Sequence, residues 1–150
     1  MNPDHFCIGK SFFVVHKYFK IFLNSRAKKY GLNGAQFLFL HRLTMRDGLS
    51  QEEINEQLSF DKGFLAKVAK SLEQGGYIVR KVNQEDRRAY KLFLTDKGKD
   101  LDMTVFKTLE EWDNAILDDV TEEEIEVIKK VFDGMIKRAA KKSKEEKEGK

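Results

Sequence analysis

Two groups of basic side chains carry the clearest chemical signal in the sequence. Lys62, Lys67 and Lys70 recur along one predicted helix, and Arg87 and Arg88 are adjacent in a polar loop. Lysine and arginine bind the oxygens of polyanions, although a single exposed cation is most often only solvated. Because these five residues would lie on two projecting elements, we interpret them together as one footprint for a polyanion.

Catalytic and metal-binding groups form no recognisable pattern. His5, His16 and His41 share no zinc-ligand spacing with the single cysteine, Cys7, and only an adventitious metal site between His5 and Cys7 stays open. Nucleophile-elbow, phosphate-loop and dinucleotide fingerprints are absent from the sequence. The acidic residues of 118–124 surround a predicted helix start, where the helix dipole stabilises them. We therefore expect no catalytic residue, no metal and no cofactor, and we expect that the protein is not an enzyme.

The elements that must position the basic groups follow from the apolar periodicity. Three- and four-residue spacing indicates helices, and alternation over short runs indicates strands. We expect helices at 6–29, 34–45, 51–58, 61–74, 96–116 and 122–140, and strands at 77–82 and 90–95. The two strands form a hairpin with a polar tip. The fold class is mainly α with a small β-hairpin wing.

Capping residues and apolar lines refine these helices. N-cap candidates are Asn33, Ser50, Asp61, Thr95 and Thr121, and glutamate follows Ser50 and Thr121 after three residues. The lines expected to face inward are Phe37, Leu38, Leu40, His41 and Met45; Leu65, Val68, Ala69 and Leu72; and Leu101, Val105, Leu109, Trp112 and Ile116. We expect His41 to be packed or hydrogen-bonded and not a ligand.

The first predicted helix, residues 6–29, is apolar on two sides. One line contains Phe6, Ile8, Phe12, Val15, Phe19 and Phe22, and the other contains Val14, Tyr18 and Ile21. A helix that is apolar on two sides must be buried on two sides. We expect its own domain to cover one side and a second copy the other, which predicts a homodimer. A central helix buried within a monomer is the alternative.

The order of the elements predicts a winged helix-turn-helix. Two short helices joined by a tight turn precede a basic hairpin. DNA fits this arrangement, since a helix fits the major groove and an arginine on a hairpin can enter the narrow minor groove. The distribution of net charge is consistent with binding of DNA by the first two thirds of the chain. The net charge is +7 over residues 1–46 and +4 over 59–100, but −7 over 101–137.

Four short motifs point to one family. They are Asp61-Lys62-Gly63, Leu72-Glu73-Gln74-Gly75-Gly76-Tyr77-Ile78, Asp86-Arg87-Arg88 and Leu94-Thr95-Asp96-Lys97-Gly98. With them the chain resembles the MarR family of winged helix-turn-helix transcriptional regulators. The Asp-Arg-Arg wing followed by Leu-Thr-x-x-Gly is the specific combination. In element order the resemblance covers residues 6–138, and it is most specific over 50–98.

The resemblance implies an assembly and a division of the chain. Residues 1–32 and 99–140 would form the dimerisation helices of a homodimer, and residues 33–98 the DNA-binding module. Each module would read half of a palindromic operator in double-stranded DNA. Residues 141–150 would be a charged tail, expected as disorder or frayed helix because the segment has no apolar residues.

The resemblance also implies roles for single residues. Arg88 would enter the minor groove, Asp86 would orient it by an ion pair, and Arg87 would contact a phosphate. Lys62 and Lys67 stand where relatives often have basic residues that contact bases or phosphates.

The groove-facing side of the predicted recognition helix departs from the family pattern. Where relatives usually have small polar residues, this chain has Gly63, Phe64 and Ala66. Phe64 or Ala66 could pack on a thymine methyl, or Phe64 could turn inward as core. Either arrangement makes shape readout through Arg88 relatively more important.

Regulation by a small molecule or by oxidation follows from the resemblance. Family members commonly respond to small aromatic anions, for which Lys10, His16, Lys17 and Tyr18 are candidate pocket residues; the alternative is that they are surface or packing residues. Peroxide-sensing relatives have a reactive cysteine near the position of Cys7, held by tyrosines that this chain lacks at the matching positions. We therefore expect Cys7 to be buried or inert.

Length and composition bound the remaining expectations. The 150 residues fit one domain with extensions, and a single cysteine suits a reducing compartment. Lysines interrupt the apolar stretch 8–23, and no cleavage site follows it, so we expect a cytoplasmic protein without membrane contact. The function expected is that of a dimeric, sequence-specific repressor released by a small effector. The alternatives are an architectural or nonspecific DNA-binding protein and a winged-helix protein-interaction module.

Overall fold

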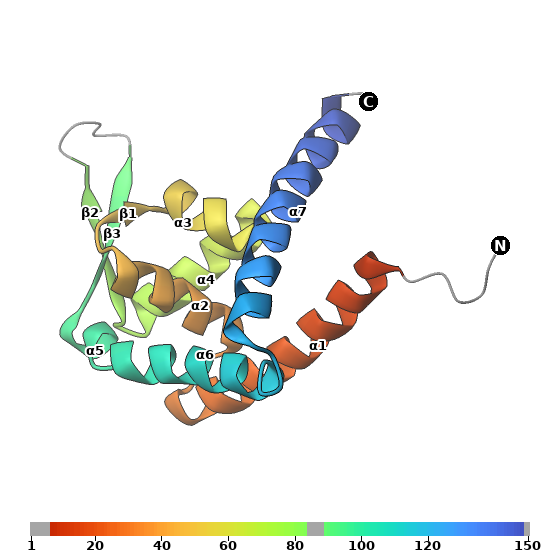
Figure 1. Ribbon diagram of the computed structural model, residues 1–150. Helices are drawn as coiled ribbons and strands as arrows, with labels where there is room; N and C mark the ends of the chain where they lie inside the picture. The colour runs from red at the N-terminus through yellow and green to blue at the C-terminus, as the bar shows by residue number, and fades with distance from the viewer. Residues whose placement is uncertain (1–6, 84–88, 149–150) are drawn as a thin grey trace. The chain divides into compact units, whose positions relative to one another are not determined.

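Helices dominate the structure, and a small antiparallel sheet accompanies them (Figure 1). The computed structural model describes residues 7–83 and 89–148. The chain divides into two units, residues 1–113 and 114–150. The elements are α1 Ile8–Ala27, the 3-10 turn η1 Lys28–Tyr30, α2 Gly34–Met45, β1 Leu49–Ser50, α3 Gln51–Leu58, α4 Lys62–Gln74, β2 Ile78–Val82, β3 Tyr90–Leu94, α5 Asp96–Lys99, α6 Asp102–Ile116 and α7 Glu122–Glu148. The predicted fold class is confirmed.

Side-chain caps fix the starts of α2, α3 and α4, as the sequence predicted. Asn33 forms a capping box with Gln36, and Ser50 forms one with Glu53. The Ser50 backbone N–H donates to the Glu53 carboxylate at 2.7 Å, and this bond chiefly holds the pKa of Glu53 below its usual value. Asp61 accepts hydrogen bonds from two backbone N–H groups at the start of α4. Each of these helices therefore begins where a side chain replaces missing backbone acceptors.

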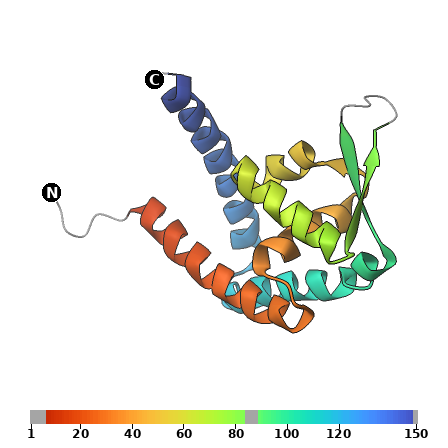
Figure 2. The ribbon, with the colours of Figure 1, turned by 180° about the vertical axis from the view of Figure 1, so that it is seen from behind.

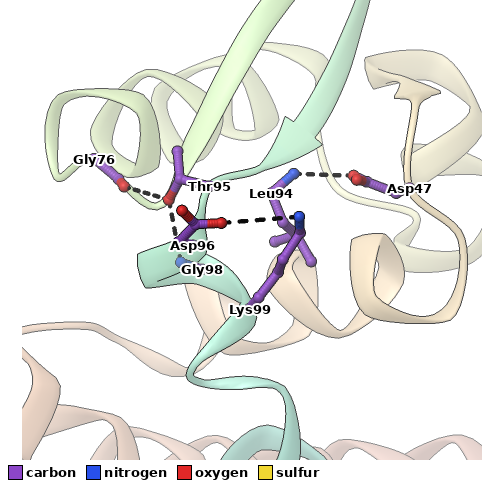
Figure 3. Close-up of polar contacts among 7 residues, drawn as sticks. All are labelled: Asp47, Gly76, Leu94, Thr95, Asp96, Gly98 and Lys99. Atoms are coloured by element: carbon purple, nitrogen blue, oxygen red, sulfur yellow. Dashed lines mark hydrogen bonds and ion pairs between the residues drawn. The ribbon is translucent and has the colours of Figure 1, made fainter.

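The sheet contains a strand that the sequence pattern did not predict. Its order is β1-β3-β2, with Leu49 opposite Leu92 and Ile78 opposite Leu94. The two residues of β1 are too few to display alternation. The Leu94 backbone N–H also donates to Asp47 Oδ1 at 2.9 Å (Figure 3). These contacts tie the turn before α3 to the hairpin.

The core of residues 1–113 includes α2, α3, α4 and the sheet, and only part of the line predicted for α2 lies in it. Met45 is 65% exposed, whereas Phe39 and Leu43 are fully buried beside Phe37 and Leu40. Helix α2 contacts α1, α3, α4 and β3. A helix covered on several sides buries more than one stripe, so spacing alone misses some of its core positions.

The single helix expected over 96–116 is wrong, because the chain bends after α5. Thr95 caps α5 as predicted: its hydroxyl accepts from the Gly98 N–H at 3.1 Å and donates to the Gly76 carbonyl at 2.6 Å (Figure 3). A Cβ at Gly98 would lie 2.2 Å from the Tyr77 carbonyl oxygen. This close approach holds α5 against the base of the hairpin, and Leu101 then enters the core before α6 begins.

Helix α7 makes up most of the second unit and extends further than predicted. The Thr121 and Glu124 capping box forms as expected. Of the two expectations for the charged tail, disorder or frayed helix, the structure has helix for residues 141–148. Lys142 lies 3.0 Å from Glu146 one turn later, and such i,i+4 pairs support a helix without apolar residues. Over the described parts of the chain, no helix is long and apolar enough to cross a membrane.

Candidate nucleic-acid interface

Helix α4 presents a basic face because its apolar line is buried as predicted. Leu65, Val68, Ala69 and Leu72 are at most 4% exposed. The opposite face carries the exposed residues Lys62, Gly63, Ala66, Lys67 and Lys70. Figure 2 shows α4 beside the hairpin, which projects beyond the helices of this unit. Burial of one face of α4 thus decides which of its side chains are available for a groove.

The turn between α3 and α4 is held by a contact that sequence reasoning missed. The Asn55 side chain donates to the Phe60 carbonyl at 3.0 Å and accepts from the Phe60 N–H at 2.9 Å. Ser59 between them has φ of 51°, in the left-handed region. Periodicity could not reveal this pair of hydrogen bonds, because the bonds depend on one amide side chain that reaches the backbone five residues away. It fixes the direction in which α4 leaves α3.

Phe64 stands on the first turn of α4 and is not a core residue. Its side chain is 46% exposed, so the inward-turned alternative is wrong. Its ring meets Phe60 edge to face, with centroids 5.3 Å apart. Phe60 is itself partly buried against the core. Phe64 is therefore an exposed aromatic ring that contacts Phe60, which in turn packs against the core.

The hairpin is paired to its end, and the predicted arginines lie beyond the described residues. Val82 is opposite Tyr90, and the Asn83 N–H donates to the Ala89 carbonyl at 2.9 Å. Residues 84–88 include Asp86, Arg87 and Arg88 and fall outside the described part of the chain. The roles of these three residues stay predictions.

Two wing lysines form a basic site that sequence reasoning did not single out. Lys81 and Lys91 are directly opposite each other in the β2–β3 ladder. The Lys81 ammonium lies 4.8 Å from the centre of the Phe93 ring. Only the register of the strands reveals this pair, since ten positions separate the two residues in the sequence. Arg80, the neighbour of Lys81, forms an ion pair with Glu73 at 3.1 Å, and the charge of Lys91 also acts on the Glu53 carboxylate.

An acidic helix borders the basic face of α4. Glu52 and Glu56 of α3 line a groove of about 520 Å³ together with Lys62. Their charges oppose the approach of a polyanion and offset the charge of Lys62. The cations best placed for a polyanion are therefore Lys67 and Lys70 on α4.

The predicted effector residues line neither described cavity, although the Lys17 ammonium lies 5.6 Å from the centre of the Tyr18 ring, and Cys7 is not buried. Lys10, His16, Lys17 and Tyr18 are all exposed on α1, and neither described cavity is lined by them. Cys7 is exposed at the start of α1, so the buried alternative is wrong. No group of three metal-ligating side chains occurs within residues 7–83 and 89–148.

His41 is packed in α2, as predicted. It is half-buried, and its Nδ1 atom is buried without a hydrogen-bond partner. Burial, followed by the nearby charge of Arg42, lowers the pKa of His41, and Asp102 opposes this shift. The neutral imidazole is the form that suits this environment.

Comparison with known proteins identifies the arrangement. A sequence profile of the MarR family matches residues 30–89. The transcriptional regulator BilQ of Clostridium symbiosum is 30% identical over 106 residues, which span 71% of this chain and 74% of that protein. The chain belongs to the MarR family. It is accordingly a DNA-binding transcriptional regulator and not an enzyme.

Solved structures extend the likeness over nearly the whole chain. A MarR transcriptional regulator from Methanosarcina mazei is 31% identical, with a TM-score of 0.79, and the match covers 89% of this chain and 90% of that one. A MarR family regulator from Listeria monocytogenes, solved in complex with 26-mer DNA, has a TM-score of 0.91 at 25% identity, with 97% of each chain covered. The predicted resemblance to the MarR family is thereby confirmed.

Proposed function

We propose that this MarR regulator is a homodimeric repressor that binds a palindromic operator and is released by a small anionic effector. The observation that carries the proposal is the pairing of an exposed basic reading surface with an exposed apolar helix in the same unit. The basic surface is suited to binding DNA, and the apolar helix is suited to packing against a second protein chain.

The dimer is supported by the second apolar line of α1. Val14 is 50% exposed, and Tyr18 and Ile21 are each 56% exposed. The N-terminal half of α1 extends away from the rest of residues 1–113 in both views (Figures 1 and 2). Exposed apolar residues that adjoin one another along one side of a helix mark an interaction surface. A second copy of the chain is the occupant that suits a regulator reading a two-fold symmetric site.

Helix α7 adds support for a dimer. Within 114–146 none of the described side chains is buried. Five large apolar residues on α7 are at least 36% exposed, namely Val127, Ile128, Val131, Phe132 and Ile136. A helix with an apolar stripe and no core gains stability by packing on another surface. Residues 1–32 and 99–140 are therefore proposed as the dimerisation layer.

Operator reading is assigned to α4 and the wing of residues 33–98. Lys67 and Lys70 would contact phosphates or base edges in the major groove, with Lys62, Gly63 and Ala66 close to the backbone. In the wing, Arg88 would enter the minor groove, with Asp86 orienting it and Arg87 on a phosphate. A dimer covering an operator blocks access to the promoter, so repression is the simplest outcome.

The first experiment compares labelled DNA from upstream of the regulator's own gene with a scrambled duplex of equal length. Fluorescence anisotropy at two salt concentrations measures both affinities. We expect a preference of ~10³-fold or more for the upstream DNA, and an affinity that falls steeply with salt. Equal binding would favour the architectural alternative, and no binding at low salt would favour a protein-interaction module; either result contradicts the proposal.

A further inference from the structure

One residue of α3, Asn55, supplies most of the hydrogen bonds that hold the turn before α4. Its side-chain Nδ2 group donates to the Phe60 carbonyl at 3.0 Å, and its Oδ1 atom accepts from the Phe60 N–H at 2.9 Å. The Asn55 backbone carbonyl also accepts from the Ser59 N–H at 2.8 Å, where α3 ends. The path of the chain from α3 to α4 therefore depends on a single side chain.

The turn needs this support because its backbone is strained at Ser59. This residue has φ of 51° and ψ of 34°, in the left-handed region that favours glycine over residues with a side chain. The two side-chain hydrogen bonds of Asn55 are partly shielded from water, which strengthens them relative to exposed ones. Without these bonds, Ser59 would be free to adopt the commoner conformations of serine.

Phe60 transmits the geometry of the turn to the start of α4. Its side chain packs against the core, and its ring contacts the Phe64 ring. Asp61 follows directly, and its side chain accepts from the Gly63 and Phe64 N–H groups. Asn55 thus determines where α4 begins and how its first turn is oriented, although Asn55 itself lies on α3.

The orientation of this first turn affects base reading more than phosphate binding. The first residues of a recognition helix reach the base edges, where a productive contact must be held to within roughly 0.5 Å. Attraction between lysines and phosphates changes only slowly with distance and depends little on the DNA sequence. A small shift of the first turn of α4 should therefore reduce discrimination between sequences and preserve nonspecific affinity.

We propose that Asn55 is a positioning residue that sets the sequence specificity of this regulator by fixing the orientation of α4. The inference rests on the operator reading proposed above and adds a determinant outside the recognition helix. The Asn55 Oδ1 and Nδ2 atoms are both engaged by Phe60, so the side chain acts on the bases through α4.

The test compares specificity, and not affinity alone, in Asn55→Ala. Alanine keeps α3 helical and removes both bonds to Phe60. Anisotropy at fixed salt measures the ratio of the affinities for upstream and scrambled DNA. We expect this ratio to fall at least tenfold, with the affinity for scrambled DNA within twofold of the parent. Gln57→Ala, which removes an exposed amide from the same helix, should keep the ratio. An unchanged ratio in Asn55→Ala, or an equal fall in both variants, overturns the proposal.

A second substitution, Ser59→Gly, separates positioning from simple stabilisation. Glycine adopts the left-handed conformation without strain, so Asn55→Ala combined with Ser59→Gly should recover most of the stability that Asn55→Ala loses in urea unfolding. The turn still lacks its two side-chain hydrogen bonds, so the specificity ratio should stay low. Recovery of the ratio together with the stability would leave Asn55 a merely structural role and overturn the proposal.

Amide hydrogen exchange, followed by NMR without DNA, tests the orientation of α4 directly. Exchange of the Phe60 and Phe64 amide hydrogens should quicken at least tenfold in Asn55→Ala and keep the parent rate in Gln57→Ala. Unchanged exchange at Phe64 would overturn the proposal. A parent protein without preference for upstream DNA would contradict the proposed function, and the exchange rates would still decide whether Asn55 positions α4.

Discussion

At the residue scale, the two cross-strand lysines of the wing indicate that DNA contacts the strands of the wing as well as its loop. Like charges directly opposite each other destabilise a strand pair. Lys81 and Lys91 stand in that relation next to the end of the hairpin. A phosphate near both ammonium groups would offset their repulsion. The strands of the wing, and not only residues 84–88, are therefore expected to touch the DNA backbone.

Arg88 is expected to contribute most to binding among the wing residues. Arg88→Ala should weaken operator binding by more than ~1 kcal/mol, because a groove contact is lost together with its charge. Anisotropy on one operator at fixed salt measures the difference. Lys20→Ala, which removes an exposed charge on α1, serves as the control. Equal affinities for Arg88→Ala and the parent would refute this role.

Phe64 is expected to recognise thymine by its methyl group. Replacing thymine by uracil at the contacted position removes only that methyl, which is worth about 0.8 kcal/mol when buried. The parent should lose affinity on the uracil operator, and Phe64→Ala should bind both operators equally. Uracil substitution at each operator position, read by anisotropy, locates the contact. A parent that is indifferent to every substitution contradicts the prediction.

His41 should make folding stability sensitive to acid. Its folded-state pKa lies below the ordinary 6.5, so as the pH falls through 6.5 the unfolded state takes up a proton before the folded state does. The free energy of unfolding should therefore decrease below that pH. Urea unfolding at pH 7.5 and 5.5 measures this decrease, and His41→Gln should show a smaller one. The same decrease in both proteins would assign it to other groups.

At the element scale, the junction of the hairpin with α5 depends on the absence of a side chain at Gly98. A Cβ there would meet the Tyr77 carbonyl at 2.2 Å, so Gly98→Ala must displace α5 or the base of the wing. Overpacking of this kind costs roughly 1–3 kcal/mol. Urea unfolding should show that loss, together with weaker operator binding. Gly9→Ala is the matched control, since a Cβ at Gly9 would have nothing within 4 Å, and it should cause no loss.

At the scale of the whole molecule, the exposed second line of α1 predicts the oligomeric state. Ile21 is 56% exposed, so Ile21→Glu should leave the fold of a single chain intact and bury a charge only if a second copy covers it. Light scattering after gel filtration should give twice 17.5 kDa for the parent and 17.5 kDa for the variant. The neighbouring exposed position supplies the control, Lys20→Glu, which should stay dimeric. A monomeric parent would contradict the dimer outright.

Local signals in the sequence determined most of the secondary structure of this MarR regulator. Asn33, Ser50, Asp61 and Thr121 each cap a helix in the way that their residue types predict, because a cap involves only three or four neighbouring residues. The inward line of α4 was equally predictable, since one face of that helix is buried and the other is exposed. The family was likewise recognisable from short sequence motifs alone.

Only the tertiary structure decided the contacts between residues far apart in the chain. Strand β1, the Lys81 and Lys91 pair and the Tyr30 and Tyr77 hydrogen bond each depend on register or packing. A pocket lined by Arg26 and Tyr30 together with Lys107 of α6 likewise combines residues far apart in the chain, whereas the sequence had pointed to neighbours along α1. The physical reason is range: caps and periodicity act within one or two turns, but register and pockets follow from how several elements pack together.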